Sequence, residues 1–462
     1  MIRRAILVAA LAGSVLAGCG TALPGFGGAG TGATRANRVH LGGAFPKGFL
    51  WGVATAGYQS EGGDEANNWH AWQVAGKFPS PVGKAVDFWN RYAEDFDLAK
   101  GMGLNAFRMS VEWSRIEPKP GQIDRASLDR YKGMIDAAVA RGLEPVVTLN
   151  HFVYPAWLDT RGGASGWERP EAPERFAAFS RLVATELKGK VRTWLTINEP
   201  NVLTVGGFAS GQIPPGRYGY GPYSAAAKGL VAAHRAAYKA LHDVDPQNRV
   251  STNVFYYYSK AGTSFDPLQL WGTDIPLTTQ TYLDWPGRQL TGFPGPYLED
   301  FGAAWLDYLA IDYYWGMAAK TMFNVRKAYN WPVSPAQLTE ACVDLYKRYG
   351  KPIMIAENGL ATKDLGKRDD MWTREAFLVH HLYYLREAIG QGVPVMGYMH
   401  WSLTDNYEWG DYAPRFGLYS VDARNDPTLA RVPTPAVDVY RQIAESNSLP
   451  SKLVWTYMGL GF

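Results

Sequence analysis

Two glutamates stand at the ends of apolar segments of this 462-residue chain. Glu199 lies near the end of "RTWLTINEPN", residues 192–201, and Glu357 near the end of "PIMIAEN", residues 352–358. A buried carboxylate is costly unless it is paired or used. Two carboxyl groups can act together as a proton donor and a nucleophile or base. Taken alone, Glu199 could equally mark a strand that has ended, with its side chain in water.

Residues near the ends of the other apolar segments have a consistent chemistry. Most are carboxylates, amides and aromatics, and they comprise Gln59, Glu61, Arg108, Glu112, Asn150, His151, Asn198, Asp312, Tyr313, Tyr314, Asn358, Trp401, Glu408 and Trp409. The sequence has no serine–histidine pair at a sharp elbow and no phosphate-cradling loop, and its eight histidines lack metal-ligand spacing. We therefore predict neither a metal nor a cofactor.

Strand and helix patterns alternate from residue 49 onward. Eight short apolar segments favour strands, at residues 49–56, 106–113, 144–150, 191–198, 249–258, 308–314, 352–358 and 394–403. Helical periodicity is found at residues 87–103, 127–142, 173–189, 223–244, 334–350, 374–392 and 434–446. Residues 259–307 are rich in proline and glycine and carry no clear assignment.

This alternation predicts the α/β class, with a single (β/α)8 TIM barrel over residues 44–447 and a tail at 448–462. A doubly wound open sheet is the competing fold, but no glycine-rich dinucleotide turn follows an early strand. In a (β/α)8 barrel the active site lies at the C-terminal ends of the strands. Glu199 and Glu357 then face one another across the barrel mouth, an arrangement that suits glycoside hydrolysis.

Six segments of the chain together resemble glycoside hydrolase family 1, the β-glucosidase-type family. They are "FPKGFLWGVATAGYQSEGG", "FRMSVEWSRIEP", "LNHFVYPAWL", "LTINEPN", "IAENG" and "HWSLTDNYEWGDYAPRFGLYSVD". They extend from about residue 45 to 422 and occur in the order of the family. The tripeptides "NEP" and "ENG" would be weak evidence alone, whereas the ordered set is specific.

The resemblance implies the roles of the catalytic residues. Glu199 in "NEP" corresponds to the acid/base, and Glu357 in "ENG" corresponds to the nucleophile. The family is retaining, so the two carboxyl groups should lie about 5 Å apart. Arg108 and Tyr314 would support Glu357, with Arg108 holding it ionised and its pKa low. Asn198 would contact the sugar 2-hydroxyl.

The resemblance also implies a sugar-binding set. Gln59, His151, Glu408 and Trp409 would bind the 3-, 4- and 6-hydroxyls, and Trp401 would stack beneath the ring. Each residue has a structural alternative: a buried ion pair for Arg108, a core histidine for His151 and barrel packing for Trp401. Glu61, Glu112 and Glu168 are interpreted as structural or surface carboxylates.

Several positions depart from the family pattern. Asp312 in "IDYY" stands where the family usually has asparagine, and an added carboxylate would raise pKa values nearby or constrain the hydrogen bonding. Ala356 replaces the usual threonine, the loop after Trp409 is shorter than is common, and residues 259–307 match no family segment. These departures weaken any inference about the substrate.

The predicted function is a retaining exo-β-glycosidase that hydrolyses terminal β-D-glucosyl or related unphosphorylated residues. Glu408 would repel a sugar 6-phosphate, which supports the unphosphorylated class. A transglycosylase using the same residues and a non-catalytic glycan-binding surface lipoprotein remain alternatives. The predicted partner is a small-molecule or oligosaccharide β-glycoside. With 46 basic and 43 acidic residues and a net charge of +3, the chain shows no sign of binding nucleic acid.

The N-terminal segment has the composition of a targeting signal. Residues 1–18 place Arg3 and Arg4 before an apolar run and small residues, a layout typical of a secretory signal. The ending "LAGC" resembles a bacterial lipobox, which implies cleavage before Cys19 and lipid attachment there. Residues 19–43 would form a flexible tether, leaving an extracytoplasmic enzyme anchored to the membrane by lipid. Plain secretion is the alternative. Cys342 is predicted to be a core residue.

Overall fold

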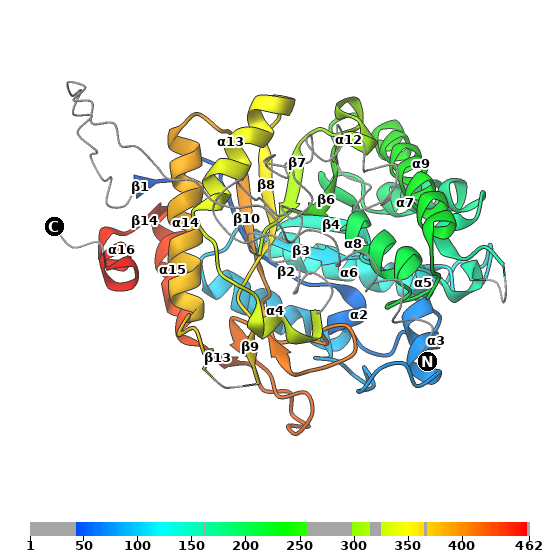
Figure 1. Ribbon diagram of the computed structural model, residues 1–462, viewed down its shortest axis with the longest axis horizontal. Helices are drawn as coiled ribbons and strands as arrows, with labels where there is room; N and C mark the ends of the chain where they lie inside the picture. Colours follow the sequence, from blue (N-terminus) through cyan, green and yellow to red (C-terminus); the bar gives the residue numbers. More distant parts are fainter. Residues whose placement is uncertain (1–42, 160–162, 257–297, 315–324, 365–366, 460–462) are drawn as a thin grey trace, which may run out of the picture. The chain divides into compact units, whose positions relative to one another are not determined.

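The computed structural model describes residues 43–159, 163–256, 298–314, 325–364 and 367–459 (Figure 1). The predicted signal segment and Cys19 lie outside these ranges, as do all but the last residue of the predicted tether. Most of the unassigned segment 259–307 also lies outside them.

Eight parallel strands close into a barrel in the order β10-β2-β3-β4-β5-β6-β7-β8 (Figure 1). The strands are β2 (Leu50–Ala54), β3 (Ala106–Ser110), β4 (Glu144–Asn150), β5 (Thr193–Asn198), β6 (Arg249–Phe255), β7 (Leu309–Asp312), β8 (Ile353–Asn358) and β10 (Val395–Trp401). The strands neighbour one another in chain order, as in a (β/α)8 barrel. The prediction of this fold is confirmed, and each strand lies within a segment whose apolar pattern predicted it.

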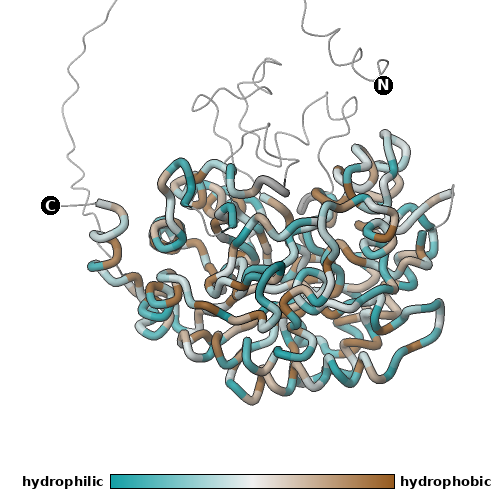
Figure 2. Tube along the Cα trace, turned by 90° about the horizontal axis from the view of Figure 1, so that it is seen from below, coloured by the Kyte–Doolittle hydropathy of each residue, from teal (hydrophilic) through white to brown (hydrophobic). Residues whose placement is uncertain are grey.

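Seven long helices follow the predicted periodic segments to within a few residues. They are α4 (Phe88–Gly101), α6 (Arg125–Ala140), α7 (Ala172–Glu186), α9 (Tyr220–Val244), α13 (Gln337–Tyr349), α14 (Arg374–Gly390) and α15 (Pro435–Ser446). Each buries one face; in α9 the buried residues include Leu230, Ala233, Ala237 and Leu241, spaced three or four apart. Figure 2 shows hydrophobic and hydrophilic stretches alternating along the chain. None of the described helices combines the length and apolarity needed to span a membrane.

Short elements connect the barrel units. They are β1 (Gly43–Ala44), α2 (Gly57–Ser60), α3 (Asn68–Val74), α5 (Trp113–Ile116), η2 (Ala156–Leu158), η3 (Gly166–Glu168), α8 (Pro200–Leu203), η4 (Thr204–Ala209), α12 (Leu298–Phe301), η6 (Ala303–Trp305), η7 (Val325–Asn330), β9 (Thr362–Lys363), β11 (Pro414–Arg415), β12 (Tyr419–Ser420), β13 (Val432–Pro433), β14 (Ser448–Leu449) and α16 (Ser451–Met458). The last two lie in the predicted tail. β14 pairs with β1, and α16 packs against α14.

The strands carry two separate layers of apolar side chains. The inner cluster contains Leu195 and Ala356, whereas Ile197 and Ile355 belong to the outer cluster that also includes helix residues. Strand side chains normally alternate between the two faces of a sheet. Leu195 and Ile197 are two residues apart yet lie on opposite faces, so β5 departs from this rule near its C-terminal end.

The departure is a β-bulge, and β8 contains a second one. Between Leu195 and Asn198, β5 advances three residues while β6 advances two; between Ile355 and Glu357, β8 advances two while β7 advances one. A bulge inserts one unpaired residue and redirects the side chains that follow. The bulge in β5 turns Asn198 toward the barrel interior, and the bulge in β8 does the same for Glu357.

Candidate active site

Glu199 immediately follows the bulge in β5. Its backbone is left-handed, with φ 41° and ψ 57°, and Pro200 begins α8 directly after it. Its N–H donates to the Asn253 carbonyl oxygen at 2.8 Å. A non-glycine residue in this conformation costs about 1–3 kcal/mol and is found mainly where the surrounding structure enforces it for function. The turn directs the carboxyl group into the barrel mouth.

Glu357 is held by two donors at the end of β8. Arg108 Nη1 lies 2.7 Å from Glu357 Oε1, and the Tyr314 hydroxyl donates to Oε2 at 2.7 Å. Burial raises the pKa of Glu357, while the charge of Arg108 and the hydrogen bonds from Tyr314 and Arg108 lower it. Arg108 therefore acts on the pKa in the predicted direction, but burial outweighs its effect.

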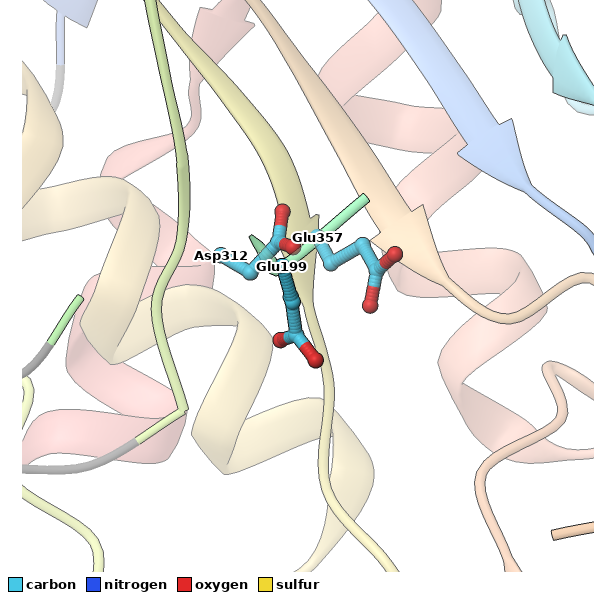
Figure 3. Close-up of side chains that lie close together, drawn as sticks. All are labelled: Glu199, Asp312 and Glu357. Atoms are coloured by element: carbon cyan, nitrogen blue, oxygen red, sulfur yellow. The ribbon is translucent and has the colours of Figure 1, made fainter. Parts of the chain in front are cut away.

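Three carboxyl groups meet in the barrel mouth. One oxygen of each of Glu199, Asp312 and Glu357 lies within 4.8 Å of the others (Figure 3). Burial raises the pKa of Glu199 well above its usual range, and the nearby charges of Asp312 and Glu357 raise it further. The surroundings of Glu199 therefore favour its protonated form, whereas Glu357 has partners that stabilise a negative charge. The two predicted glutamates have opposite electrostatic environments.

A buried polar network orients Asn198. Its Oδ1 accepts from Arg108 Nη2 at 2.5 Å and from Asn253 Nδ2 at 2.5 Å. Both donors fix the amide orientation, so Asn198 Nδ2 is the free end and has no hydrogen-bond partner among the described residues. An N–H group without a partner in a buried site is available to a ligand hydroxyl.

Gln59 and Glu408 form a second polar group with Trp401. Gln59 Nε2 donates to Glu408 Oε2 at 3.3 Å, and Trp401 Nε1 donates to Glu408 Oε1 at 3.2 Å. Gln59 Oε1 is buried and has no partner among the described residues. Burial is the main cause that raises the pKa of Glu408, to about 8, and the charge of Glu357 also raises it. The hydrogen bond from Trp401 lowers that pKa.

His151 lies near two indole rings and nearly parallel to both. Its ring centroid is 5.7 Å from that of Trp401 and 5.8 Å from that of Trp409, with interplanar angles of 13° and 12°. Its Nδ1 is buried and has no partner among the described residues. Burial lowers the pKa of His151 well below its usual range, and the charge of Arg108 lowers it further. The imidazole is therefore neutral, with a ring nitrogen available to a ligand.

The remaining predicted residues lie apart from this centre. Glu61 pairs with Arg115 at 2.8 Å, Glu112 accepts from the Ser110 hydroxyl at 2.6 Å, and Glu168 pairs with Arg217 at 2.8 Å. These contacts fit structural carboxylates. Cys342 is buried in α13, and burial raises its thiol pKa to about 12, so it is not a reactive thiolate.

In the described part of the chain, only one set of three or more potential ligand residues lies close enough together to hold a metal ion. It consists of Glu199, Asp312 and Glu357. Arg108 already supplies a positive charge at 2.7 Å from Glu357. The guanidinium therefore already offsets the charge of one of these three carboxyl groups.

The sequence of the chain matches that of a known enzyme family. Residues 41–266 and 315–449 match the model described as Glycosyl hydrolase family 1. The chain belongs to glycosyl hydrolase family 1. Residues 267–314 are unmatched, and they include most of the segment that carried no assignment from sequence, together with Asp312.

Curated relatives cover nearly the whole chain. A beta-galactosidase of Sulfolobus acidocaldarius is 28% identical over 495 residues, which cover 89% of this chain and 97% of that protein. Beta-glucosidase A of Thermotoga maritima is 29% identical over 446 residues, which cover 88% and 98%. Family membership and these relatives make the chain a glycosyl hydrolase.

Solved family 1 structures share the fold. A beta-glycosidase from Pyrococcus horikoshii has a TM-score of 0.74 and 29% identity, covering 90% of this chain and 98% of that chain. A family 1 glucosidase from Thermotoga maritima in complex with isofagomine lactam also has a TM-score of 0.74, with 26% identity, 87% coverage of this chain and 99% of that chain.

Asn253 is a member of this family 1 site that sequence reasoning missed. It lies on β6, and its Nδ2 donates to Asn198 Oδ1 and to Asp312 Oδ2. The available signal was an asparagine within the otherwise apolar segment "VSTNVF" of a predicted strand. Such a residue is costly to bury without partners.

Proposed function

We propose that this family 1 enzyme is a retaining exo-β-glycosidase acting on terminal β-D-glucosyl or related unphosphorylated glycosyl residues. The observation that supports it is the close approach of two glutamates in opposite electrostatic environments, with carboxyl oxygens within 4.8 Å. Retaining enzymes place their carboxyl groups about 5–5.5 Å apart, and this close approach of single oxygens fits that spacing. The glucosidase and galactosidase names of the relatives support the substrate class.

In the first step, Glu357 is the nucleophile. Its carboxylate attacks the anomeric carbon as the bond to the aglycone oxygen breaks. Arg108 and Tyr314 stabilise the carboxylate before attack, each donating at 2.7 Å. Glu199 gives its proton to the departing oxygen, so that an alcohol leaves and a glycosyl-enzyme remains.

In the second step, Glu199 reverses its role. It takes a proton from water as the water oxygen attacks the anomeric carbon, and the ester bond to Glu357 breaks. Formation of the ester removes the negative charge of Glu357, which is one of the charges that raise the pKa of Glu199. The same residue therefore serves as an acid in one step and a base in the next.

The buried unpaired groups supply the sugar contacts. Asn198 Nδ2 would donate to the 2-hydroxyl, where contacts strengthen in the transition state. Gln59, His151, Glu408 and Trp409 would bind the 3-, 4- and 6-hydroxyls. Trp401 would stack against the sugar ring.

Glu408 is relevant to whether the sugar carries a 6-phosphate. In its ionised form, which its raised pKa of about 8 places at mildly alkaline pH, a carboxylate near the 6-position accepts hydrogen bonds from a hydroxyl but repels a phosphate. All five predicted hydroxyl-binding residues, including Asn198, are buried, which suits a closed site for one terminal unit.

A panel of purified-enzyme assays tests this function. The substrates are 4-nitrophenyl β-glucoside, β-galactoside, β-glucoside 6-phosphate and α-glucoside. We expect turnover of the unphosphorylated β-glycosides and none of the other two. Transfer of the sugar to an added alcohol, seen as an alkyl glycoside, would show transglycosylation. Absence of turnover across the panel would favour the glycan-binding alternative.

For location, we propose that the enzyme is lipid-anchored at Cys19 outside the cytoplasm. The support is the "LAGC" ending behind Arg3, Arg4 and an apolar run. Residues 19–43 would tether the barrel to the membrane.

A further inference from the structure

We propose that Glu199 and Asp312, whose nearest carboxyl oxygens lie within 4.8 Å of each other, share one proton, and that Asp312 thereby helps the acid/base to keep it. This inference rests on the proposed role of Glu199. It makes Asp312 a positioning residue, because it acts on the reaction through Glu199 and not on the sugar.

The charges in the site do not balance without such a proton. Arg108 pairs with Glu357, and its other N–H groups donate to Thr148, to the carbonyl oxygen of Ala356 and to Asn198. Among the described residues no lysine, arginine or histidine forms an ion pair with Glu199 or Asp312. Two unpaired buried carboxylates in contact would be strongly unfavourable, and a single shared proton removes most of that cost.

The hydrogen bonds show where the proton belongs. Asp312 Oδ2 accepts from Asn253 Nδ2. Asp312 Oδ1 is buried and receives no hydrogen bond from an N–H or hydroxyl group of the described residues. A carboxyl oxygen of Glu199 nevertheless lies within 4.8 Å of one of Asp312. A proton on Glu199 supplies the missing donor to Oδ1, and Asn253 favours the ionised form of Asp312.

Charged and titratable neighbours act on the pKa values of the pair. Besides each other, Glu199 and Asp312 lie near Arg108 from β3, Tyr314 after β7 and Glu357 at the end of β8. Burial and the charge of Glu357 raise the pKa of Asp312, while Arg108, Asn253 and Glu199 lower it. The negative charge of Asp312 raises the pKa of Glu199, whereas the contact with Glu199 lowers the pKa of Asp312. Glu357 ionises first, Asp312 next and Glu199 last.

This order has a direct consequence for catalysis. The first step requires Glu199 protonated, so kcat/KM is lost as pH rises through the pKa of Glu199. A negative Asp312 raises that pKa and moves the loss to higher pH. Once Glu199 has given its proton to the leaving oxygen, the ionised Asp312 makes it a stronger base toward water in the second step.

The test is the pH dependence of kcat/KM in Asp312→Asn, which keeps the size of the side chain and removes its charge. An alkyl β-glucoside is the substrate, since a poor leaving group requires protonation. We expect the alkaline limb to move down by about one to three pH units, with a smaller change in the acid limb. Asp307→Asn, just before the opposite end of β7, is the control and should leave both limbs in place. An unchanged alkaline limb in Asp312→Asn, or an upward shift, would overturn the proposal.

A second measurement does not depend on turnover or on that variant. Infrared difference spectra of the full-length enzyme across pH follow the carbonyl stretch of protonated carboxyl groups. We expect a band that persists above neutral pH and is missing from Glu199→Gln. If wild type and Glu199→Gln titrate identically, the shared proton is wrong even where the enzyme is active. If the band is present but no glycoside is turned over, the shared proton stands and the proposed function fails.

Discussion

At the scale of single residues, the two glutamates differ in their surroundings and not in their chemistry. Glu357 has a guanidinium and a phenol as donors, while Glu199 has two carboxylates as neighbours. The first environment favours a carboxylate and the second favours a carboxylic acid. This contrast supports the two proposed roles without reference to position in the chain.

Tyr314 should influence the acid limb of the pH profile. Its hydroxyl donates to Glu357 Oε2 at 2.7 Å, and a hydrogen bond to a charged group contributes about 1.5–3 kcal/mol. In Tyr314→Phe the Glu357 pKa rises. Because Glu357 must be ionised, kcat/KM is then lost at a higher pH as the solution is acidified, by roughly 1–2 units. Kinetics from pH 4 to 8 would measure the shift, and an unchanged acid limb would show that Tyr314 does not stabilise the carboxylate.

Glu408 should contribute mainly to sugar binding. Its two oxygens each accept one hydrogen bond, from Gln59 and from Trp401. Gln59 Nε2 also donates to Asn406 Oδ1 at 3.0 Å. A glutamine side chain has only one acceptor oxygen, so Glu408→Gln loses one of the two hydrogen bonds and also one carboxyl oxygen that could accept from the sugar. We expect a higher KM and a lower kcat on β-glucosides, with kcat/KM reduced by roughly 10–100-fold. Wild-type kinetics in this variant would place Glu408 outside the sugar site.

At the scale of elements, the two β-bulges determine which side chains reach the barrel mouth. With regular alternation, β5 would direct Asn198 toward the helices, since Leu195 faces inward. The extra residue before Asn198 reverses this, and the bulge in β8 does the same for Glu357. The sequence predicts the strands and helices well, because apolar periodicity reflects burial.

The sequence could not predict the bulges or the network around Asn253. A bulge leaves no compositional signal in "TWLTIN" or "IMIAEN". The role of Asn253 in the site is recognisable only from its hydrogen bonds to β5 and β7. The sequence does not specify the register of these strands. The positions of Glu199 and Glu357 were predictable because they lie in "NEP" and "ENG", within segments that occur in the order of the family.

Asn447 joins the two ends of the barrel domain and offers a test at this scale. It ends α15 with φ 44°, its Oδ1 accepts from Trp51 Nε1 at 2.9 Å, and its Nδ2 donates to the Phe45 carbonyl at 3.0 Å. Asn447→Ala loses both bonds and disfavours the left-handed backbone, so we expect it to lower stability by about 2–4 kcal/mol. Asn447→Gly keeps the backbone conformation and should be less destabilised. Thermal unfolding would measure both variants, and kcat/KM at 25 °C should match wild type. A higher Tm for alanine than for glycine would contradict the backbone argument.

At the scale of the whole molecule, a family 1 barrel occupies most of the chain. The N-terminal residues contain the proposed signal segment and lipidation site. Wild type expressed in a bacterium that processes lipoproteins should partition into the detergent phase, and Cys19→Ala into the aqueous phase. Cys342→Ala is a control that should partition as wild type does, because Cys342 is buried in the barrel domain. Equal aqueous recovery of wild type and Cys19→Ala would rule out the anchor.

The central claim is that Glu199 moves the proton and Glu357 holds the sugar, and the stereochemistry of azide products tests it most directly. In Glu199→Ala, an aryl glycoside with a good leaving group still glycosylates Glu357. Attack by water then lacks its base and slows by roughly 10²–10⁴-fold. Azide needs no base, so it should restore turnover and give the β-glycosyl azide. In Glu357→Ala, azide can replace only the missing nucleophile and should give the inverted α-azide. Proton NMR of the products distinguishes the two anomers. A β-azide from Glu199→Ala and an α-azide from Glu357→Ala are the predicted results, whereas an α-azide from Glu199→Ala or retained products from Glu357→Ala would contradict the assignment.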